Sequence, residues 1–157
     1  MNGGGVGVAE NKAAVERLFD EVWNGRRFDM IDELYATDYV ADYRPYAPLR
    51  EGRDAVRQMV ERAWTTMPDY HEELIAMVAE GDVVAVHLRI SGTQDGHWGP
   101  IPPTGKRLEF DEMLFLTFNA SGQVVHQRGI VDNLAGLRQA GVIPTPSNAS
   151  ESGPDGQ

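Results

Sequence analysis

The sequence predicts a single α+β domain shaped as a cone, in which a curved antiparallel sheet carries about three N-terminal helices on its concave face. Apolar residues recur at helical spacing in the first half of the chain and at every second position in the second half. Helices that precede strands are typical of α+β folds rather than of alternating βαβ folds. The length of 157 residues is enough for one sizeable core. A cavity between the sheet and the helices is the expected ligand site.

Three helices are expected in the first half. Each of the two longer ones has an apolar stripe that faces a core. The first stripe consists of Val15, Leu18, Phe19, Val22 and Trp23, and the second of Val56, Met59, Val60, Ala63, Trp64 and Met67. Asn24-Gly25 ends the first helix, while Gly52 and Pro68 bound the second. A short helix is expected at 28–36.

The second half is expected to form four antiparallel strands, because its apolar residues alternate. The first two strands flank a tight turn at residues 80–82, and the others are expected at 107–118 and 123–131. His87 and Arg89 share the polar face of strand 83–91, which predicts contact with solvent or a dimer partner. Alternation alone leaves open which face of strand 123–131 points inward. A short helix that Gly141 ends is expected to close the domain.

The two ends of the chain differ in composition from the rest. Residues 1–8 are glycine-rich, which predicts a flexible lead, and residues 144–157 are rich in Pro, Ser and Gly without large apolar side chains. Such a segment cannot bury enough surface to offset its ordering entropy, so we expect a disordered tail. The working domain is expected at 9–143.

Composition excludes several classes of function. The net charge of −10 argues against binding to nucleic acid or to anionic membranes, which both require a basic surface. The chain has no cysteine, which excludes disulfides, thiolate metal sites and cysteine nucleophiles. Its four histidines lack metal-ligand spacing, and no nucleophile elbow, P-loop or dinucleotide fingerprint is present. The histidine spacing therefore predicts that the protein has no metal site. No apolar run is long enough to cross a bilayer, so we expect a cytoplasmic protein.

Glu112 is the main candidate for chemistry. It is the one carboxylate among the even positions of strand 107–118, which otherwise carry Leu108, Phe110, Leu114, Leu116 and Phe118. Alternate residues of a strand share a face, so Glu112 is expected to point into an apolar cavity. Burial there would raise the pKa of the carboxyl group toward neutrality, as a general acid or base requires. The alternative is an ion pair with Arg89, Arg107 or Arg128, or a kink that turns Glu112 to solvent.

The connection 92–106 is too long for a tight hairpin, and long loops on a rigid scaffold often serve as lids or specificity loops. It contains His97 and Trp98, which are candidates for substrate contact. The compatible alternative is that Trp98 and Ile101 cover the open end of the cone.

Four stretches resemble the SnoaL-like polyketide cyclases of the nuclear-transport-factor-two-like superfamily. They are NKAAVERLFDEVWNGRRFDMIDELYATDYV, AEGDVVAVHLRISGT, GPIPPTGKRLEF and DNLAGLRQAG, and together they cover about 10–142. The resemblance implies a cone-shaped fold and an intramolecular aldol condensation that needs no metal and no organic cofactor. The wider superfamily also contains isomerases, dehydratases, epoxide hydrolases, hydroxylases and plain ligand binders, so fold alone does not decide the activity.

The resemblance also implies positions for the site. The family's catalytic Asp falls at Gly129, which cannot move a proton, and a family His falls at Gln127. A polar pocket residue falls at Glu112. Another falls at Ala41, beside Asp42 and Tyr43, which adds the last two as candidates for substrate contact. The implied inward-facing set of Glu112, Gln127 and Gly129 agrees with the alternation of strand 107–118.

These observations predict a small cofactor-independent enzyme of polyketide or secondary-metabolite biosynthesis. Glu112 would act as general acid or base on an apolar, enolisable substrate, and Gln127 would bind the substrate oxygen. The first alternative is the same fold with hydroxylation, hydration, dehydration, isomerisation or rearrangement. The second is a non-catalytic module that binds a small apolar metabolite or serves for dimerisation. We expect a homodimer through the outer sheet face.

Overall fold

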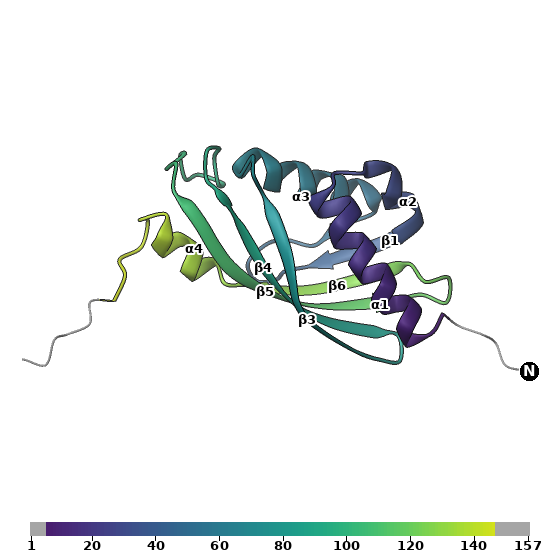
Figure 1. The fold of residues 1–157 in the computed structure, drawn as a ribbon. Coiled ribbons are helices and arrows are strands. Elements are labelled where there is room, and N and C mark those ends of the chain that lie inside the picture. The colour runs from purple at the N-terminus through teal and green to yellow at the C-terminus, as the bar shows by residue number, and fades with distance from the viewer. Residues whose placement is uncertain (1–5, 147–157) are drawn as a thin grey trace, which may run out of the picture.

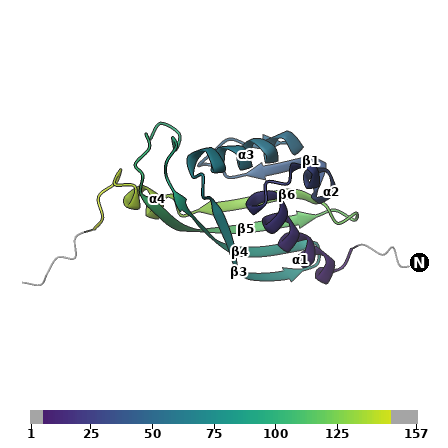
Figure 2. The ribbon, with the colours of Figure 1, turned by 45° about the horizontal axis from the view of Figure 1, so that its top comes forward.

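A six-stranded sheet forms the centre of the structure, a computed structural model that describes residues 6–146. The helical elements are α1 (Val8–Arg17), a π-helical segment (Leu18–Asn24), a 3-10 turn (Phe28–Met30), α2 (Ile31–Leu34), α3 (Arg53–Thr66) and α4 (Asn133–Gln139). The strands are β1 (Tyr35–Asp42), β2 (Arg50–Glu51), β3 (His71–Glu80), β4 (Val83–Thr93), β5 (Arg107–Phe118) and β6 (Val124–Val131). Figure 1 and Figure 2 show α1 and α3 on the concave face of the curved sheet, which confirms the predicted fold class.

The two long helices form where the apolar periodicity predicts them. The first runs as α1 and then continues with π-helical hydrogen bonding through Leu18–Asn24, which buries Leu18, Phe19, Val22 and Trp23. The second, α3, begins after Gly52, whose positive φ of 78° suits glycine, and ends before Pro68. α1 begins at Val8, one residue before the expected start of the domain. Residues 1–5 of the expected lead and residues 147–157 of the expected tail lie outside the described residues.

The short helix expected at 28–36 is only partly present. The helical turns end at Leu34, and β1 begins at Tyr35. Tyr35 and Tyr39 are fully buried, and their rings meet edge to face with centroids 5.0 Å apart. β-branched and aromatic residues favour an extended backbone, and the stretch YATDYV is rich in them. The tertiary contacts of these two tyrosines therefore override the helical spacing that residues 28–35 also show.

The sheet is mixed rather than wholly antiparallel. β3, β4, β5 and β6 form the expected antiparallel meander, and the strand order is β2-β1-β6-β5-β4-β3. β1, however, pairs with β6 in parallel. The sequence pattern could not show this, because β1 and β6 are far apart in the chain and no hairpin fixes their relative direction.

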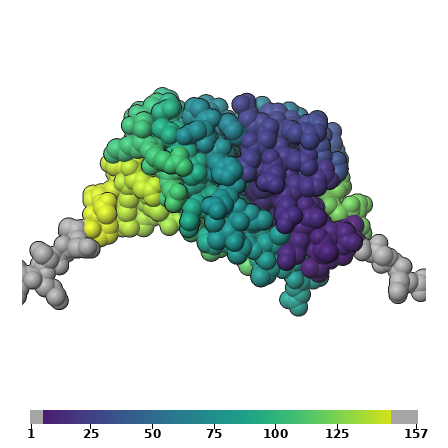
Figure 3. Space-filling view, viewed as in Figure 1, coloured from purple at the N-terminus to yellow at the C-terminus, as the bar shows by residue number. Residues whose placement is uncertain are grey.

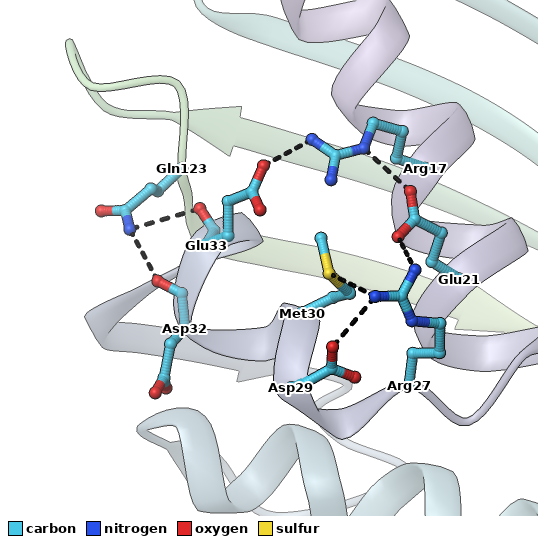
Figure 4. Close-up of polar contacts among 8 residues, drawn as sticks. All are labelled: Arg17, Glu21, Arg27, Asp29, Met30, Asp32, Glu33 and Gln123. Carbon is cyan, nitrogen blue, oxygen red and sulfur yellow. Dashed lines mark hydrogen bonds and ion pairs between the residues drawn. The ribbon is translucent and has the colours of Figure 1, made fainter.

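Ion pairs and hydrogen bonds connect the N-terminal helical elements to one another and to the sheet (Figure 4). Arg17 bridges Glu21 at 2.9 Å and Glu33 at 2.6 Å, and Arg27 binds Glu21 at 3.0 Å. Gln123, from the turn before β6, donates to the backbone oxygen of Asp32 at 3.2 Å. Exposed pairs of this kind stabilise little, but they hold α2 against the end of the sheet.

The alternation along β4 and β5 decides what faces the helices. The even-numbered residues of both strands are buried and the odd-numbered ones are more exposed. His87 and Arg89 lie on the outer face, as predicted, and both bind Asp111, at 2.9 and 3.1 Å. On β6 the inward positions include Gln127 and Gly129, which settles the face that alternation left open. Figure 3 shows α4 at the end of the molecule opposite the start of α1.

Candidate active site in the cone

A cavity of about 180 Å³ lies between the concave sheet face and the helices. Its wall is mostly apolar and includes Trp23, Met59, Ile90, Leu108, Phe110 and Val131. Glu112 is the one carboxylate in the wall formed by residues 6–146. Such a cavity, apolar with a few polar groups, has the usual character of a small-molecule site.

Glu112 points into this cavity from β5 and is only 6 % exposed. The phenol of Tyr43 donates a hydrogen bond to Glu112 Oε1 at 2.7 Å. Arg89, Arg107 and Arg128 pair instead with other carboxylates, on Asp111, Asp69 and Asp42. Within the described residues no cation pairs with Glu112, so neither structural alternative for this residue holds: it is not ion-paired and not turned to solvent.

Burial determines the proton affinity of Glu112. The pKa of this carboxyl group is raised to about 7. Burial is the main cause, and the hydrogen bond from Tyr43 acts in the opposite direction by a smaller amount. The physical cause is the loss of hydration of the charged form in an apolar wall. A carboxyl group with this pKa can both accept and return a proton near neutral pH.

A chain of hydrogen bonds leads from β1 and β6 to Glu112. Tyr39 donates to Gln127 Oε1 at 3.0 Å, the amide nitrogen of Gln127 donates to the oxygen of Tyr43, and Tyr43 donates to Glu112. Gln127 is 2 % exposed and is not part of the cavity wall. It therefore contacts Tyr43 rather than the space that a substrate would fill.

The ring of Tyr43 occupies the space beside Gly129. A Cβ atom added to Gly129 would overlap that ring and would lie 2.7 Å from Leu114 Cδ2. The absence of a side chain at position 129 is thus what lets Tyr43 reach Glu112. The position to which the resemblance assigns a catalytic Asp is filled by a phenol, and the carboxylate of the cavity comes from β5 instead.

The other predicted contact residues separate into two groups. Trp98 lines the cavity and stacks on Phe110, with ring centroids 5.9 Å apart. His97 is exposed and is not in the wall; its backbone oxygen accepts from Thr66 at 2.9 Å. Asp42 also lies outside the wall, where Arg44 binds it at 3.0 Å and holds the pKa of its carboxyl group well below the usual range.

The long connection is held by hydrogen bonds within itself and by a hydrogen bond to α3. Gln94 is fully buried and its side chain bonds to Gly96, Pro102 and Thr104. The amide of Gly96 donates to the backbone oxygen of Thr66 on α3 at 3.0 Å. This bracing fixes Trp98 as a wall of the cavity, which agrees with the expected covering role.

A second buried carboxyl group, Glu72 on β3, was missed by the sequence reasoning. It is 4 % exposed and accepts a hydrogen bond from Tyr70, which lines the cavity, while its Oε2 has no partner among the described residues. Burial and the charge of Glu112 both raise the pKa of Glu72. The signal that could have found it is the alternation of Tyr70, Glu72 and Leu74 in the sequence.

Neither a metal nor a membrane helix is indicated by residues 6–146. No group of three or more His, Cys, Asp or Glu residues in this range could hold a metal ion. No helix in the same range is long and apolar enough to cross a bilayer.

Comparison with known proteins identifies the family. The sequence profile of the SnoaL-like polyketide cyclases matches residues 13–140, whereas no curated protein matches the chain. A proposed SnoaL-like polyketide cyclase from Jannaschia sp. CCS1 has a similar structure, with a TM-score of 0.77 and 25% identity over 87% of this chain and 94% of that one.

Two further structures share the fold. AclR, a proposed hydroxylase from Streptomyces galilaeus, has a TM-score of 0.78 and 24% identity over 90% of this chain and 87% of that one. IdmH, a proposed polyketide cyclase from Streptomyces antibioticus, has a TM-score of 0.71 and 24% identity over 84% and 99% of the two chains. The profile match over most of the domain, together with the cone and its cavity, shows that this chain belongs to the SnoaL-like polyketide cyclase family.

Proposed function

We propose that the protein is an enzyme that closes a ring in an apolar, enolisable metabolite, polyketide-derived, by an acid–base aldol reaction within the cone. The observation that carries this proposal is the carboxyl group of Glu112, which is buried in the cavity wall without a cation and has a pKa of about 7. A group of this kind can remove a proton from a carbon next to a carbonyl near neutral pH and return it later.

The reaction balances without an external reagent. Glu112 takes the proton of a carbon–hydrogen bond next to a carbonyl, which leaves an enolate. The enolate carbon attacks a second carbonyl of the same substrate, so that a carbon–carbon bond forms and an alkoxide results. The protonated Glu112 then returns its proton to that alkoxide. No electrons leave the substrate, so the proposed reaction needs no redox cofactor, and the proton transfers need no metal.

Tyr43 is the proposed partner of Glu112 in this step. It lines the cavity and donates to Glu112 at 2.7 Å, and a donor so placed can stabilise the carboxylate or the developing enolate oxygen. Gln127 and Tyr39 are positioning residues, because they contact Tyr43 and each other rather than the cavity. Gln127 therefore has a different role from the direct contact with the substrate oxygen expected from the sequence.

A second candidate function keeps the same acid–base group and changes the reaction. The Tyr43 ring lies beside Gly129, the position to which the resemblance assigns a carboxylate, and this supports the second candidate, since the proposed proton acceptor is on β5 instead. Isomerisation, hydration or dehydration would each require one group that accepts and donates a proton. A non-catalytic binding role for the cavity is the third possibility that the experiment must separate.

Proton removal can be measured without the natural substrate. The probe is 2-tetralone, a small apolar ketone with acidic hydrogens, incubated with the protein in D₂O and followed by the loss of its α-hydrogen signal in NMR. We expect exchange above the buffer rate that rises with pH and levels off above about pH 7, where Glu112 is ionised. Glu112→Gln should reduce the exchange to the buffer rate.

The matched control is Glu109→Gln, which changes the same residue type on the same strand at an exposed position. It should exchange like the unaltered protein. Equal rates in the unaltered protein and Glu112→Gln, including rates no higher than buffer, would contradict the acid–base role and favour a binding module.

We also propose that the protein forms a homodimer through the outer sheet face. Large apolar side chains are exposed there, among them Met113 and Phe115 on β5, at 51% and 56% exposure, and Val78 on β3. Exposed apolar patches on a sheet often mark protein interfaces. His87 and Arg89 on this face are already paired with Asp111, so the apolar groups rather than these two residues would supply the contact.

A further inference from the structure

We propose that the substrate carries an anionic oxygen group, a carboxylate or a phosphate, which Arg50 and Arg62 bind at the mouth of the cavity. This inference rests on the proposed function, because it specifies the substrate class of the same cavity. It starts from the two guanidinium groups in a wall that is otherwise mostly apolar.

The register of the sheet directs Arg50 toward the cavity. Arg50 on β2 lies opposite Ala41 on β1, and residues directly opposite each other share one face of a sheet. Ala41 is buried, and it lies two positions from both Tyr39 and Tyr43, so these three residues share the inner face. Arg50 therefore extends over the same face as Tyr43, and it is half-buried there.

Helical spacing directs Arg62 to the same cavity from α3. Met59, Arg62, Ala63 and Thr66 all line it, at positions of α3 that are three or four residues apart and so share one helix face. Arg62 is exposed, as is Tyr46, which is 62% exposed and also part of the wall. The exposed lining residues mark the open end of the cavity, whereas Glu112 lies at its buried side.

Neither arginine has a protein partner in residues 6–146. Two other arginines, Arg26 and Arg57, lie over aromatic rings. Ion pairs with carboxylates are formed by Arg17, Arg27, Arg44, Arg53, Arg89, Arg107 and Arg128. Arg50, Arg62 and Arg138 do neither among the described residues, although the chain contains 24 acidic residues, and of these three Arg50 and Arg62 line the cavity. Two cations that line one mostly apolar cavity, neither of them paired with a carboxylate among the described residues, are an arrangement that an anionic ligand would complete.

The chemistry of the guanidinium group selects the ligand class. Its fixed fork of N–H donors matches the paired oxygens of a carboxylate or a phosphate. A protein with a net charge of −10 repels anions on average, so binding an anion requires local positive charge of this kind. With the anion at the arginines, the apolar body of the ligand would lie against Trp23 and Phe110 and reach toward Glu112.

The test compares three probes with the same ring system: 2-naphthoate, 2-naphthyl phosphate and the neutral 2-naphthamide. Their dissociation constants are measured by calorimetry at low salt. We expect at least one anion to bind about three- to tenfold more tightly than the amide, as partly exposed charge pairs allow. Arg50→Gln and Arg62→Gln should each reduce that preference, and the stronger of the two anions identifies the group.

Arg57→Gln is the matched control, because it removes the same charge from α3 at a side chain that lies over Phe28 and outside the cavity wall. It should leave the preference unchanged. The inference is overturned if neither anion binds, if the amide binds as well as both anions, or if the control weakens the anions as much as the other variants do. Its failure is separate from that of the proposed function, because 2-tetralone exchange in Glu112→Gln tests a neutral probe.

Discussion

Replacing Glu112 by glutamine is expected to stabilise the protein above neutral pH. The side chains have nearly the same shape, and the glutamine oxygen can still accept the hydrogen bond from Tyr43. What disappears is the cost of holding a charged carboxylate in an apolar wall, where Glu112 is 6 % exposed. The variant should therefore fold, and its stability should lose one specific dependence on pH.

The sign and size of that dependence follow from the two pKa values. Burial raises the pKa of Glu112 from an ordinary 4.5 to about 7 in the folded protein. Between these values the folded state binds more protons than the unfolded state, so the contribution of Glu112 to stability falls as pH rises from 4.5 through 7. The full loss is about 3 kcal/mol, of which about 2–3 kcal/mol falls between pH 5 and pH 8.

The assay is urea denaturation of the unaltered protein, Glu112→Gln and the exposed control Glu109→Gln at pH 5, 6, 7 and 8. We expect the free energy of unfolding of Glu112→Gln, minus that of the unaltered protein, to increase by about 2–3 kcal/mol from pH 5 to pH 8. The control should show no comparable trend. Carboxylates with lowered pKa values, such as Asp42 and Asp111, lose their charge below this range and contribute equally to all three proteins.

A difference that stays flat across pH 5–8 would refute the reasoning. It would mean that Glu112 is hydrated or paired in the folded protein, and the acid–base role would then lose its physical basis. A decrease toward pH 8 would show that the charged form is stabilised, as in an ion pair.

Two further predictions concern the packing and assembly of the fold. Gly129→Ala should destabilise the protein by about 1–3 kcal/mol in urea denaturation, because the added methyl group overlaps the Tyr43 ring; an unchanged midpoint would show that the ring is free to move. Light scattering at micromolar concentration should give twice the chain mass of 17.3 kDa, and Phe115→Glu on the outer face should give the single mass. A single mass for the unaltered protein would contradict the dimer.

Local sequence was sufficient wherever a regular period describes the environment of a residue. The alternation of β5 predicted correctly that Glu112 faces inward, and the helical stripes predicted the span of α3 closely. Local sequence was less successful at Glu72. β3 contains a register shift between Leu74 and Ala76, so its less exposed positions change from even to odd numbers and no single alternation marks its inner face. Local sequence also failed at Tyr35, where burial against Tyr39 favours a strand over the short helix.

The sequence by itself determined that this is an α+β domain with one carboxylate on an apolar strand face, because both properties depend on periods of two and 3.6 residues along the chain. Only the tertiary structure decided what that carboxylate meets. Tyr43 reaches Glu112 across 69 positions of sequence, and it can do so because the parallel pairing of β1 with β6 places its ring over Gly129. The same folding leaves Arg50 and Arg62 facing one cavity. Contacts of this kind depend on strand order and on empty space, and neither is visible in a local pattern of residues.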